Sequence, residues 1–313
     1  MNGFRDGAVR VRVPATSANL GPGFDALGLA LGRYDEVTAR VTASGLSVDV
    51  SGEGDALPRD ETHLVVRAMR ATFDRMGGQP PGLSLSCTNR IPHGRGLGSS
   101  AAAIVSGVLA ARALVPGGDD RLPDTAAFAL AADLEGHPDN VAAALLGGLT
   151  LAWTADGTAH AVRADVVPDL RPVAFVPPFE SGTAQARALL PATVPHADAA
   201  FTAGRSGLLV ALLSGAVPAT TATLLDATDD RLHQPYRTTA QPGTGALITV
   251  LREIGIAALM SGAGPTVLAL TLSAADAERA LEHTPSGWAG SELPVAGDGA
   301  RVQLATSVPE RGE

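Results

Sequence analysis

Residues 91–101 form a glycine-rich segment, IPHGRGLGSSA, between a predicted strand and a predicted helix. Glycine lets the backbone approach an anion closely, and the free N–H groups of a first helical turn present about half a positive charge to it. The hydroxyls of Ser99 and Ser100 can hydrogen-bond a phosphate, and one of them can bind magnesium, which prefers oxygen ligands. The segment therefore favours phosphate binding, with a simple helix cap as the alternative. Its glycines lack the G-x-G-x-x-G spacing of a dinucleotide site.

Two further segments combine polar side chains with turn-forming residues. In the first, the amide of Asn19 can bind a hydroxyl and the carboxylate of Asp25 can bind an ammonium group. In the second, Glu135 ends one predicted helix and Asp139 starts the next, and the Glu135 carboxylate can bind magnesium. Taken alone, these residues are also typical of turns, and Asp139 of an N-cap. The glycine-containing loop 261–265 is likewise typical of a turn.

The charged residues exclude several classes of protein. The net charge of -9 disfavours nucleic acid and anionic membranes as partners, because both attract positive charge. The chain has no lysine, and all 23 of its basic side chains are arginine. A Walker A loop, a protein kinase and a pyridoxal-phosphate enzyme each need a specific lysine, so all three are excluded.

Length and cysteine content indicate a cytoplasmic protein of two domains. A chain of 313 residues, 45% of them hydrophobic, can bury a substantial core. The single cysteine, Cys87, cannot form an internal disulfide, and we expect it to be a small buried side chain. The longest apolar stretch, 141–153, is too short and too rich in glycine to span a bilayer, so we expect no membrane segment.

Hydrophobic periodicity predicts a mixed α and β chain. Val9, Val11 and Val13 alternate with arginines as in a half-buried strand, which Pro14 is expected to end. The apolar spacing and the positions of glycine and proline predict the other elements. The predicted strands are 34–41, 46–50, 83–88, 172–176, 256–260, 266–272 and 301–305, with a strand and then a hairpin or linker over 151–160. The predicted helices are 65–76, 99–114, 125–135, a short one from 139, 197–213, 246–254 and 273–283. We expect a domain boundary near residue 165.

Three segments match, in order, the motifs of the GHMP small-molecule kinases: 17–25, 92–101 and 260–266. The chain resembles that superfamily from Val9 to about Leu272, and segments 135–141 and 230–237 resemble those of members that phosphorylate L-homoserine. The resemblance implies an α+β protein with the GHMP kinase fold. Residues 1–165 would form an N-terminal, ATP-binding domain like domain 2 of ribosomal protein S5. Residues 166–313 would form a C-terminal, ferredoxin-like α/β sandwich domain.

The resemblance also implies roles for individual residues. The ATP-binding residues would be Pro92, His93, Gly94, Arg95, Gly96, Leu97, Gly98, Ser99, Ser100 and Ala101. Ser100 and Glu135 would hold Mg²⁺. The residues binding L-homoserine would be Asn19, Asp25, His137, Asp139, Asn140, Thr183, Arg187, Arg237 and Gly262. Among these, Asn19 would contact the reacting hydroxyl and Asp25 the ammonium group, while Arg187 and Arg237 would bind the carboxylate.

The implied catalytic residues are Asn19, Asn140 and Arg187, and none of them is a base. Asn140 stands where other members of the superfamily carry a catalytic aspartate, and an amide cannot accept the proton. We therefore predict direct, magnesium-assisted phosphoryl transfer, with Asp139 as the alternative candidate base. The chain departs from the family at two positions, where Gly182 replaces a usual serine and Ala143 a common proline.

Two other functions remain open. Another GHMP kinase would act on mevalonate or a sugar, and these substrates lack the ammonium group that Asp25 would bind. A regulatory protein would keep the ATP site without catalysis, although the intact Ser100, Glu135, Arg187 and Arg237 argue against that alternative. The leading interpretation makes O-phospho-L-homoserine for threonine biosynthesis, with ATP and Mg²⁺ as cofactors, a small-molecule substrate, and a homodimer left open.

Overall fold

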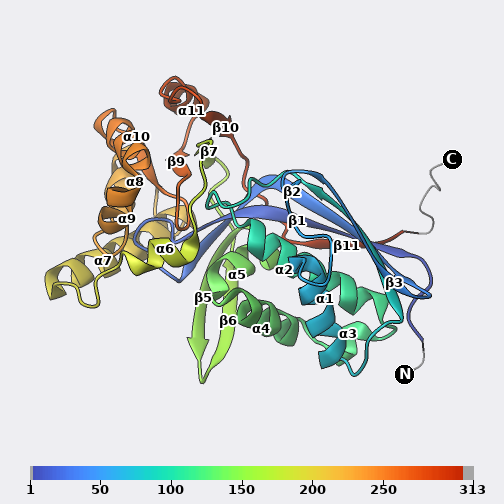
Figure 1. Cartoon of the computed structure of the whole chain (residues 1–313). Helices are drawn as coiled ribbons and strands as arrows, with labels where there is room; N and C mark the ends of the chain where they lie inside the picture. Colours follow the sequence, from blue (N-terminus) through green and yellow to red (C-terminus); the bar gives the residue numbers. More distant parts are fainter. Residues whose placement is uncertain (1–2, 306–313) are drawn as a thin grey trace.

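The structure, a computed structural model, describes residues 3–305 and contains two β-sheets (Figure 1). The larger sheet has the strand order β11-β1-β2-β4-β3, and β5 and β6 extend it from β2. Among the described strands of this sheet, only the β3–β4 pair is parallel. The strands are β1 (Ala8–Ala18), β2 (Leu27–Thr42), β3 (Gly45–Gly52), β4 (Gly82–Asn89), β5 (Leu149–Ala155), β6 (Thr158–Ala164) and β11 (Arg301–Ala305).

Strand β1 leads directly to the first polar segment. Its valines are buried and Arg10 and Arg12 are exposed, which confirms the predicted alternation. The expectation that pairing ends at Pro14 was wrong, because β1 continues to Ala18. Its register against β2 shifts between Pro14 and Ala15. A strand tolerates proline at such an irregularity, where the missing N–H costs no regular ladder bond.

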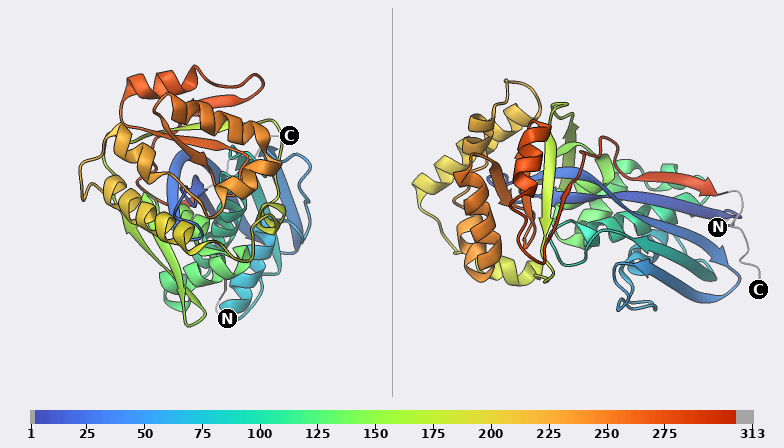
Figure 2. Two further views of the ribbon diagram at one scale, coloured as in Figure 1. Left: turned by 90° about the vertical axis from the view of Figure 1, so that its left-hand side faces the viewer. Right: turned by 90° about the horizontal axis from the view of Figure 1, so that it is seen from above.

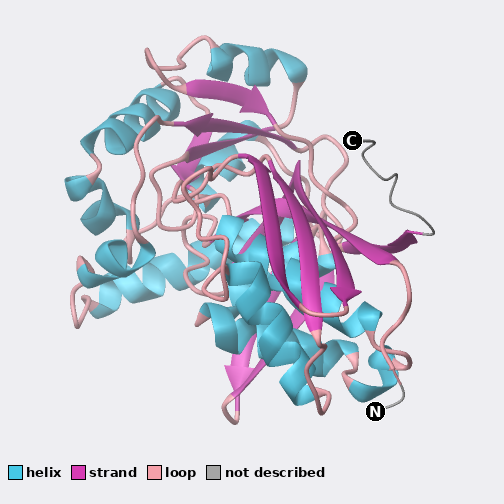
Figure 3. Ribbon diagram, turned by 45° about the vertical axis from the view of Figure 1, so that its right-hand side comes forward, coloured by secondary structure: helices cyan, strands magenta, loops and turns pink. Residues whose placement is uncertain are grey.

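Helices α1 to α5 cover one face of this sheet (Figure 3). They are α1 (Leu64–Arg75), α2 (Ser99–Leu114), α3 (Gly118–Arg121), α4 (Asp124–Glu135) and α5 (Pro138–Leu146). The central helix, α2, packs against α1, α4, α5, β1 and β2, and most of its residues are buried. Small side chains make this possible, since a Cβ atom on Gly107 would lie 2.5 Å from the carbonyl oxygen of Val65 in α1. The small alanine and glycine side chains of α2 therefore let this helix pack closely against its neighbours beneath the sheet.

The smaller sheet has the order β10-β7-β9-β8 and is antiparallel throughout. Its strands are β7 (Arg171–Val176), β8 (Ala257–Met260), β9 (Val267–Thr271) and β10 (Ala289–Glu292). The helices are α6 (Thr183–Ala188), α7 (His196–Leu213), α8 (Thr221–Ala227), α9 (Gln234–Ala240), α10 (Pro242–Glu253) and α11 (Ala274–Leu281). Helices α6 to α10 connect β7 to β8, and α11 connects β9 to β10 (Figure 2). The chain order is thus the β-α-β-β-α-β pattern of a ferredoxin-like fold, as predicted.

One face of the smaller sheet shares an apolar core with the larger sheet, and its other face packs in a separate apolar cluster with α10 and α11. Ala174, Leu259 and Leu268 of the smaller sheet are fully buried in the same cluster as residues of β1 and β2. The chain crosses between the sheets after β6 and returns with β11, which pairs with β1. The domain boundary at residue 165 therefore stays a prediction, and residues 306–313 of the second predicted domain lie outside the described range. No helix over residues 3–305 is long and apolar enough to cross a membrane.

Candidate active site

The glycine-rich segment leads into the start of α2. Its three glycines, Gly94, Gly96 and Gly98, all have positive φ angles, of 63°, 74° and 71°. Side chains would also clash there, since a Cβ atom on Gly96 would lie 2.3 Å from the carbonyl oxygen of Ser261. Over residues 3–305, no side chain caps the first turn of α2, so its N–H groups are free to bind an anion.

The loop between β8 and β9 supports this segment from the other sheet. The hydroxyl of Ser261 donates to the carbonyl oxygen of Gly96 at 2.6 Å and can accept a hydrogen bond from the hydroxyl of Ser17, 2.9 Å away. The N–H of Gly262 donates to the carbonyl oxygen of Ala18 at 3.1 Å. All three motif segments of the sequence therefore meet at one place, although they are far apart along the chain.

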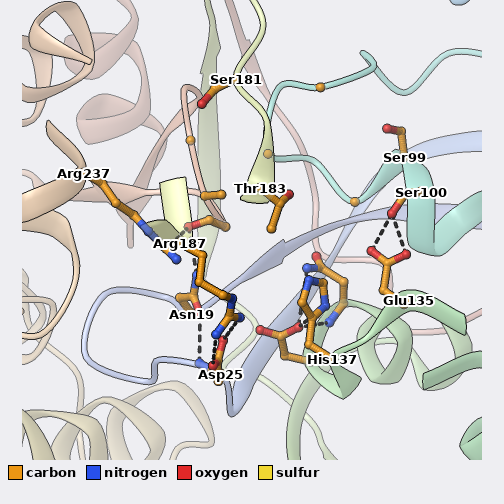
Figure 4. Close-up of a pocket in the computed structure, with 18 residues that line it drawn as sticks. Asn19, Asp25, Ser99, Ser100, Glu135, His137, Ser181, Thr183, Arg187 and Arg237 are labelled. Carbon is orange, nitrogen blue, oxygen red and sulfur yellow. Dashed lines mark hydrogen bonds and ion pairs between the residues drawn. The ribbon is translucent and has the colours of Figure 1, made fainter. Parts of the chain in front are cut away.

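A cavity of about 130 Å³ lies where these segments meet (Figure 4). From the predicted ATP-binding loop, its lining includes Gly94, Gly96, Gly98, Ser99 and Ser100. Every residue predicted to bind the substrate also lines it: Asn19, Asp25, His137, Asp139, Asn140, Thr183, Arg187, Arg237 and Gly262. Both predicted metal ligands, Ser100 and Glu135, face the same cavity. The fold thus gathers residues from both sheets into a single site.

The remaining residues of the predicted ATP-binding loop do not line this cavity. Pro92, Leu97 and Ala101 are buried beneath the loop. His93 faces a neighbouring cavity. The guanidinium group of Arg95 turns toward the segment that follows β7, where it donates to the carbonyl oxygen of Pro177 at 3.1 Å. These residues shape the loop or its surroundings.

Glu135 and Ser100 meet beside the phosphate segment. The Ser100 hydroxyl hydrogen-bonds the Glu135 carboxylate, and the distance to Oε2 is 2.5 Å. Burial raises the pKa of Glu135, while the hydrogen bond from Ser100 acts in the opposite direction. Hydroxyl and carboxylate oxygens are the donors that magnesium prefers, so the pair fits a Mg²⁺ ion. Residues 3–305 contain no group of three or more His, Cys, Asp or Glu side chains suited to a metal.

The opposite end of the cavity carries two arginines and one carboxylate. Arg187 of α6 donates to both oxygens of Asp25, at 2.8 and 2.9 Å. These hydrogen bonds raise the pKa of Arg187. Arg237 of α9 is 1% exposed, and its Nη1 donates to the carbonyl oxygen of Gly262 at 3.1 Å. Burial lowers the pKa of Arg237, with further lowering by the nearby charge of Arg187. The ring of Phe24 lies beneath both guanidinium groups.

The loop that carries Asp25 is held in a tight conformation. Asn19 has a φ of +67° and Asp25 a φ of +55°, values that few residues other than glycine adopt. The Asn19 side chain donates to the carbonyl oxygen of Gly262 at 2.8 Å and accepts the N–H of Asp25 at 2.9 Å. Both polar atoms of Asn19 thus fix the loop, and its predicted contact with the reacting hydroxyl stays a prediction.

The start of α5 closes the floor of the cavity with Asp139 and Asn140. The Asp139 carboxylate is buried, accepts the N–H of Asn140 at 2.7 Å, and lies 3.5 Å from Nδ1 of His137. Burial raises the pKa of Asp139, and the nearby His137 opposes this effect. The Asn140 side-chain oxygen accepts a hydrogen bond from the hydroxyl of Thr16 at 2.7 Å. Asp139 is therefore the titratable group closest in sequence and space to Asn140.

Several residues that contribute to the cavity were not predicted from the sequence. Thr16 and Ser261 act from beneath the cavity, and Ser181 lines it directly. Both Thr16 and Ser261 are hydroxyl residues within or next to a motif segment, and that position is the sequence signal that could have found them. The structure shows that both are buried. Cys87 is buried, as expected, and burial raises its thiol pKa to about 12, so it is not a nucleophile at neutral pH.

A second cavity, of about 300 Å³, adjoins the first through Gly94, Ser99 and Ser100. Its walls are mainly apolar, with Leu57, Pro58, Leu64, Val65 and Ala103 among them. The buried side chains of His63 and Ser106 also face it, and His63 Nδ1 and Ser106 Oγ have no hydrogen-bond partner over the described residues. The sequence did not predict this cavity.

Comparison with known proteins gives the same assignment for both halves of the chain. The family of GHMP kinases N terminal domain matches residues 63–148, and that of GHMP kinases C terminal matches residues 208–289. The fold and the site thus define the class: the chain belongs to the GHMP kinases, as predicted.

The individual relatives narrow this class further. Homoserine kinase of Streptomyces avermitilis is 56% identical over 300 residues, which cover 96% of this chain and 97% of that one. Homoserine kinase of Clavibacter michiganensis is 50% identical over 303 residues, which cover 95% and 94%. The crystal structure of homoserine kinase from Cytophaga hutchinsonii has a TM-score of 0.82 at 29% identity and covers 97% of this chain and 99% of its own.

Proposed function

We propose that the protein transfers the γ-phosphoryl group of ATP to the hydroxyl of L-homoserine, giving O-phospho-L-homoserine and ADP. One observation carries this proposal. A single cavity joins the free amides at the start of α2 to the carboxylate of Asp25 and the guanidinium groups of Arg187 and Arg237. The amides suit a polyphosphate, and the other groups suit an α-amino acid. The names of the relatives support the same substrate.

The nucleotide would bind across the two adjoining cavities. Backbone amides of residues 94–100 would hold the phosphates, which explains how a chain without lysine can bind ATP. The apolar second cavity would take the nucleoside, because a nucleobase buries a large flat apolar face. Gly94, Ser99 and Ser100 line both cavities, so phosphates and nucleoside would be continuous there.

Ser100 and Glu135 would hold Mg²⁺ together with phosphate oxygens and water. Magnesium characteristically uses only one or two protein oxygens in phosphate-binding sites, which agrees with a single carboxylate here. When bound, the ion neutralises charge on the phosphates and helps to align them. A cation beside Glu135 would also favour the ionised carboxylate, whose pKa burial raises.

The amino-acid substrate would bind at the Asp25–Arg187 end of the cavity. Its carboxylate would accept hydrogen bonds from Arg187 and Arg237, while its ammonium group would bind Asp25. Each charge-assisted hydrogen bond is worth roughly 1.5 to 3 kcal/mol, which corresponds to about a tenfold to hundredfold change in affinity. The hydroxyl would then point toward the phosphates, near Asn19 and Asn140.

We propose direct transfer without a side-chain base. A loose transition state needs alignment and charge neutralisation more than proton removal, and the helix amides and Arg187 can supply both. Asn140 cannot accept a proton, and its oxygen already accepts the hydroxyl of Thr16. Asp139 stays the alternative base, because burial raises its pKa toward the range in which it could take a proton.

The product, O-phospho-L-homoserine, would serve threonine biosynthesis, and we propose the cytoplasm as the place of the reaction. This location agrees with the single, buried cysteine, which gives no sign of an oxidising compartment.

A coupled assay of ADP formation tests the proposed function. Purified protein with ATP and Mg²⁺ should turn over L-homoserine, and phosphorus NMR should identify the phosphate ester on its hydroxyl. Mevalonate and galactose, which lack the ammonium group, should be poor substrates. If either compound were turned over faster than L-homoserine, the result would support the function of a different GHMP kinase. Binding of ATP without ADP formation from any of the three would support a regulatory protein.

A further inference from the structure

His233 lies at the start of α9, one helical turn before Arg237. Both side chains are almost completely buried, at 0% and 1% exposure. Residues four apart on a helix face the same side, and Nη1 of Arg237 lies 3.2 Å from Nδ1 of His233. The same Nη1 atom donates to the carbonyl oxygen of Gly262 at 3.1 Å. Two acceptors thus fix one end of the guanidinium group.

The surroundings of His233 determine which ring nitrogen carries the proton. Its Nε2 lies 2.8 Å from the carbonyl oxygen of Gly21, which can only accept a hydrogen bond. Nε2 must therefore carry the hydrogen. A guanidinium group can only donate, so Nδ1 must be free of hydrogen to accept from Arg237. The two contacts together require the neutral imidazole with its proton on Nε2.

Charges near the ring agree with a neutral imidazole. Burial lowers the pKa of His233, and Arg237 of the same helix lowers it further. Asp230, from the connection between α8 and α9, and Asp25, from the loop after β1, act in the opposite direction. The Asp230 carboxylate is already engaged, because it accepts the N–H groups of residues 232, 233 and 234 at 2.7 to 3.0 Å.

His233 also contacts the loop that carries Asp25. Its ring stacks on Phe24, with ring centres 5.1 Å apart and an angle of 27° between the planes. Arg237 lies over the same phenyl ring, 5.2 Å from its centre. Through Gly21 and Phe24, one imidazole therefore contacts the loop at two points and also contacts Arg237.

We infer that His233, as the neutral Nε2–H tautomer, is a positioning residue that fixes the guanidinium group of Arg237 relative to the loop carrying Asp25. This inference rests on the proposed function, because Arg237 and Asp25 would bind the carboxylate and the ammonium group of one amino acid. His233 thereby sets the distance between the two charged groups that the site accepts. It would not touch the substrate or ATP.

Two substitutions separate the roles of the ring nitrogens. In His233→Asn, the side-chain oxygen can replace Nδ1 as the acceptor for Arg237. In His233→Gln, the longer amide can replace Nε2 as the donor to Gly21 but leaves Arg237 without this acceptor. The Michaelis constant for L-homoserine should rise about tenfold in His233→Gln and much less in His233→Asn. That for ATP should stay unchanged in both, and the exposed His196→Gln is the matched control.

A double substitution tests whether the effect passes through Arg237. Adding His233→Gln to Arg237→Ala should not raise the Michaelis constant for L-homoserine any further. The substrate analogue 3-aminopropan-1-ol, which lacks the carboxylate, should also be insensitive to His233→Gln. Full additivity in the double variant, an equal rise in the ATP constant, or a larger defect in His233→Asn than in His233→Gln would overturn the inference. A wild-type protein inactive on L-homoserine would instead refute the proposed function.

The tautomer can be measured without any activity. In protein carrying ¹⁵N-labelled histidine, two-bond proton–nitrogen correlation spectra distinguish a protonated from a bare ring nitrogen. The signal that disappears in His233→Asn should have its proton on Nε2 and a bare Nδ1 at neutral pH. A proton on Nδ1, or on both nitrogens, would overturn the inference even if the protein phosphorylates L-homoserine.

Discussion

Asp25 and Arg187 form a bidentate ion pair at the cavity, with N–O distances of 2.8 and 2.9 Å. One residue comes from the loop after β1 and the other from α6, so the pair joins the two sheets at the site (Figure 4). An α-amino acid carries one charge of each sign. It can therefore exchange this pair for two new ones, its carboxylate with Arg187 and its ammonium group with Asp25.

Replacing Asp25 should affect the amino acid and not the nucleotide. Asp25→Asn removes the charge but keeps a residue that tolerates the φ of +55°, so backbone strain should not increase. We expect the L-homoserine Michaelis constant to rise about tenfold to hundredfold, with that for ATP unchanged. Steady-state kinetics with each substrate varied in turn measures both. An equal change in both constants would contradict the assignment of Asp25 to the ammonium group.

Truncating Arg237 and truncating Glu135 should cause different kinetic defects. Arg237→Ala should raise the Michaelis constant for L-homoserine far more than that for ATP, because Arg237 lies at the amino-acid end of the cavity. Glu135→Ala should chiefly lower turnover, because the carboxylate would hold magnesium and not substrate. Thermal melting of both variants checks that they are folded. Indistinguishable kinetic defects in the two variants would contradict these separate roles.

Asp139→Asn tests the catalytic base and stability together. Since burial raises the pKa of Asp139, the folded state holds its proton to higher pH than the unfolded state does. Ionising this carboxylate therefore costs stability as pH rises above its unfolded pKa, so the neutral asparagine should raise the melting temperature at neutral pH. Direct transfer predicts that turnover survives within about tenfold, whereas loss of a general base costs about a hundredfold or more.

Arg95 should couple the binding of ATP to the binding of L-homoserine. Its guanidinium group donates to the carbonyl oxygens of Pro177 and Pro178, both at 3.1 Å, and so ties the phosphate loop to the segment leading into α6. Arg95→Ala should weaken binding of both ATP and L-homoserine, because α6 carries Arg187. Isothermal titration with each ligand, alone and in the presence of the other, measures this coupling.

Glu180→Ala is the matched control for Arg95. The Arg95–Glu180 pair is 3.4 Å apart and the glutamate is 66% exposed, so its loss should change either affinity very little. The coupling would then depend on the carbonyl contacts of Arg95. A defect in Glu180→Ala as large as that in Arg95→Ala would contradict this explanation.

The sequence predicted the elements whose signals are local. The alternating valines of β1 and the alanine-rich run of α2 are such signals: α2 lies where it was expected, and β1 includes the expected residues but continues past Pro14 to Ala18. The short helices α6, α8 and α9 were missed, because each has only six or seven residues, too few to show a clear helical period of apolar side chains. At the start of α9, for example, the Asp230 carboxylate accepts the N–H groups of His233 and Gln234, but an aspartate before a short helix resembles any turn residue.

The candidate site was predictable as a set of residues but not as a geometry. The family resemblance as a whole named most residues of the main cavity, yet the sequence could not show that both polar atoms of the Asn19 amide hold a loop. Nor could it tell that Arg95 points away from the cavity toward Pro177. The direction of a long side chain depends on which acceptors the fold brings near, and these come from the other sheet.

The most direct measurement is a crystal structure with L-homoserine and a non-hydrolysable ATP analogue bound together. We expect the polyphosphate to lie against the amides of residues 94–100, the amino-acid carboxylate to bind Arg187 and Arg237, and the substrate hydroxyl to point at the terminal phosphate. An amino acid bound away from both arginines, or a polyphosphate remote from the start of α2, would contradict this expectation.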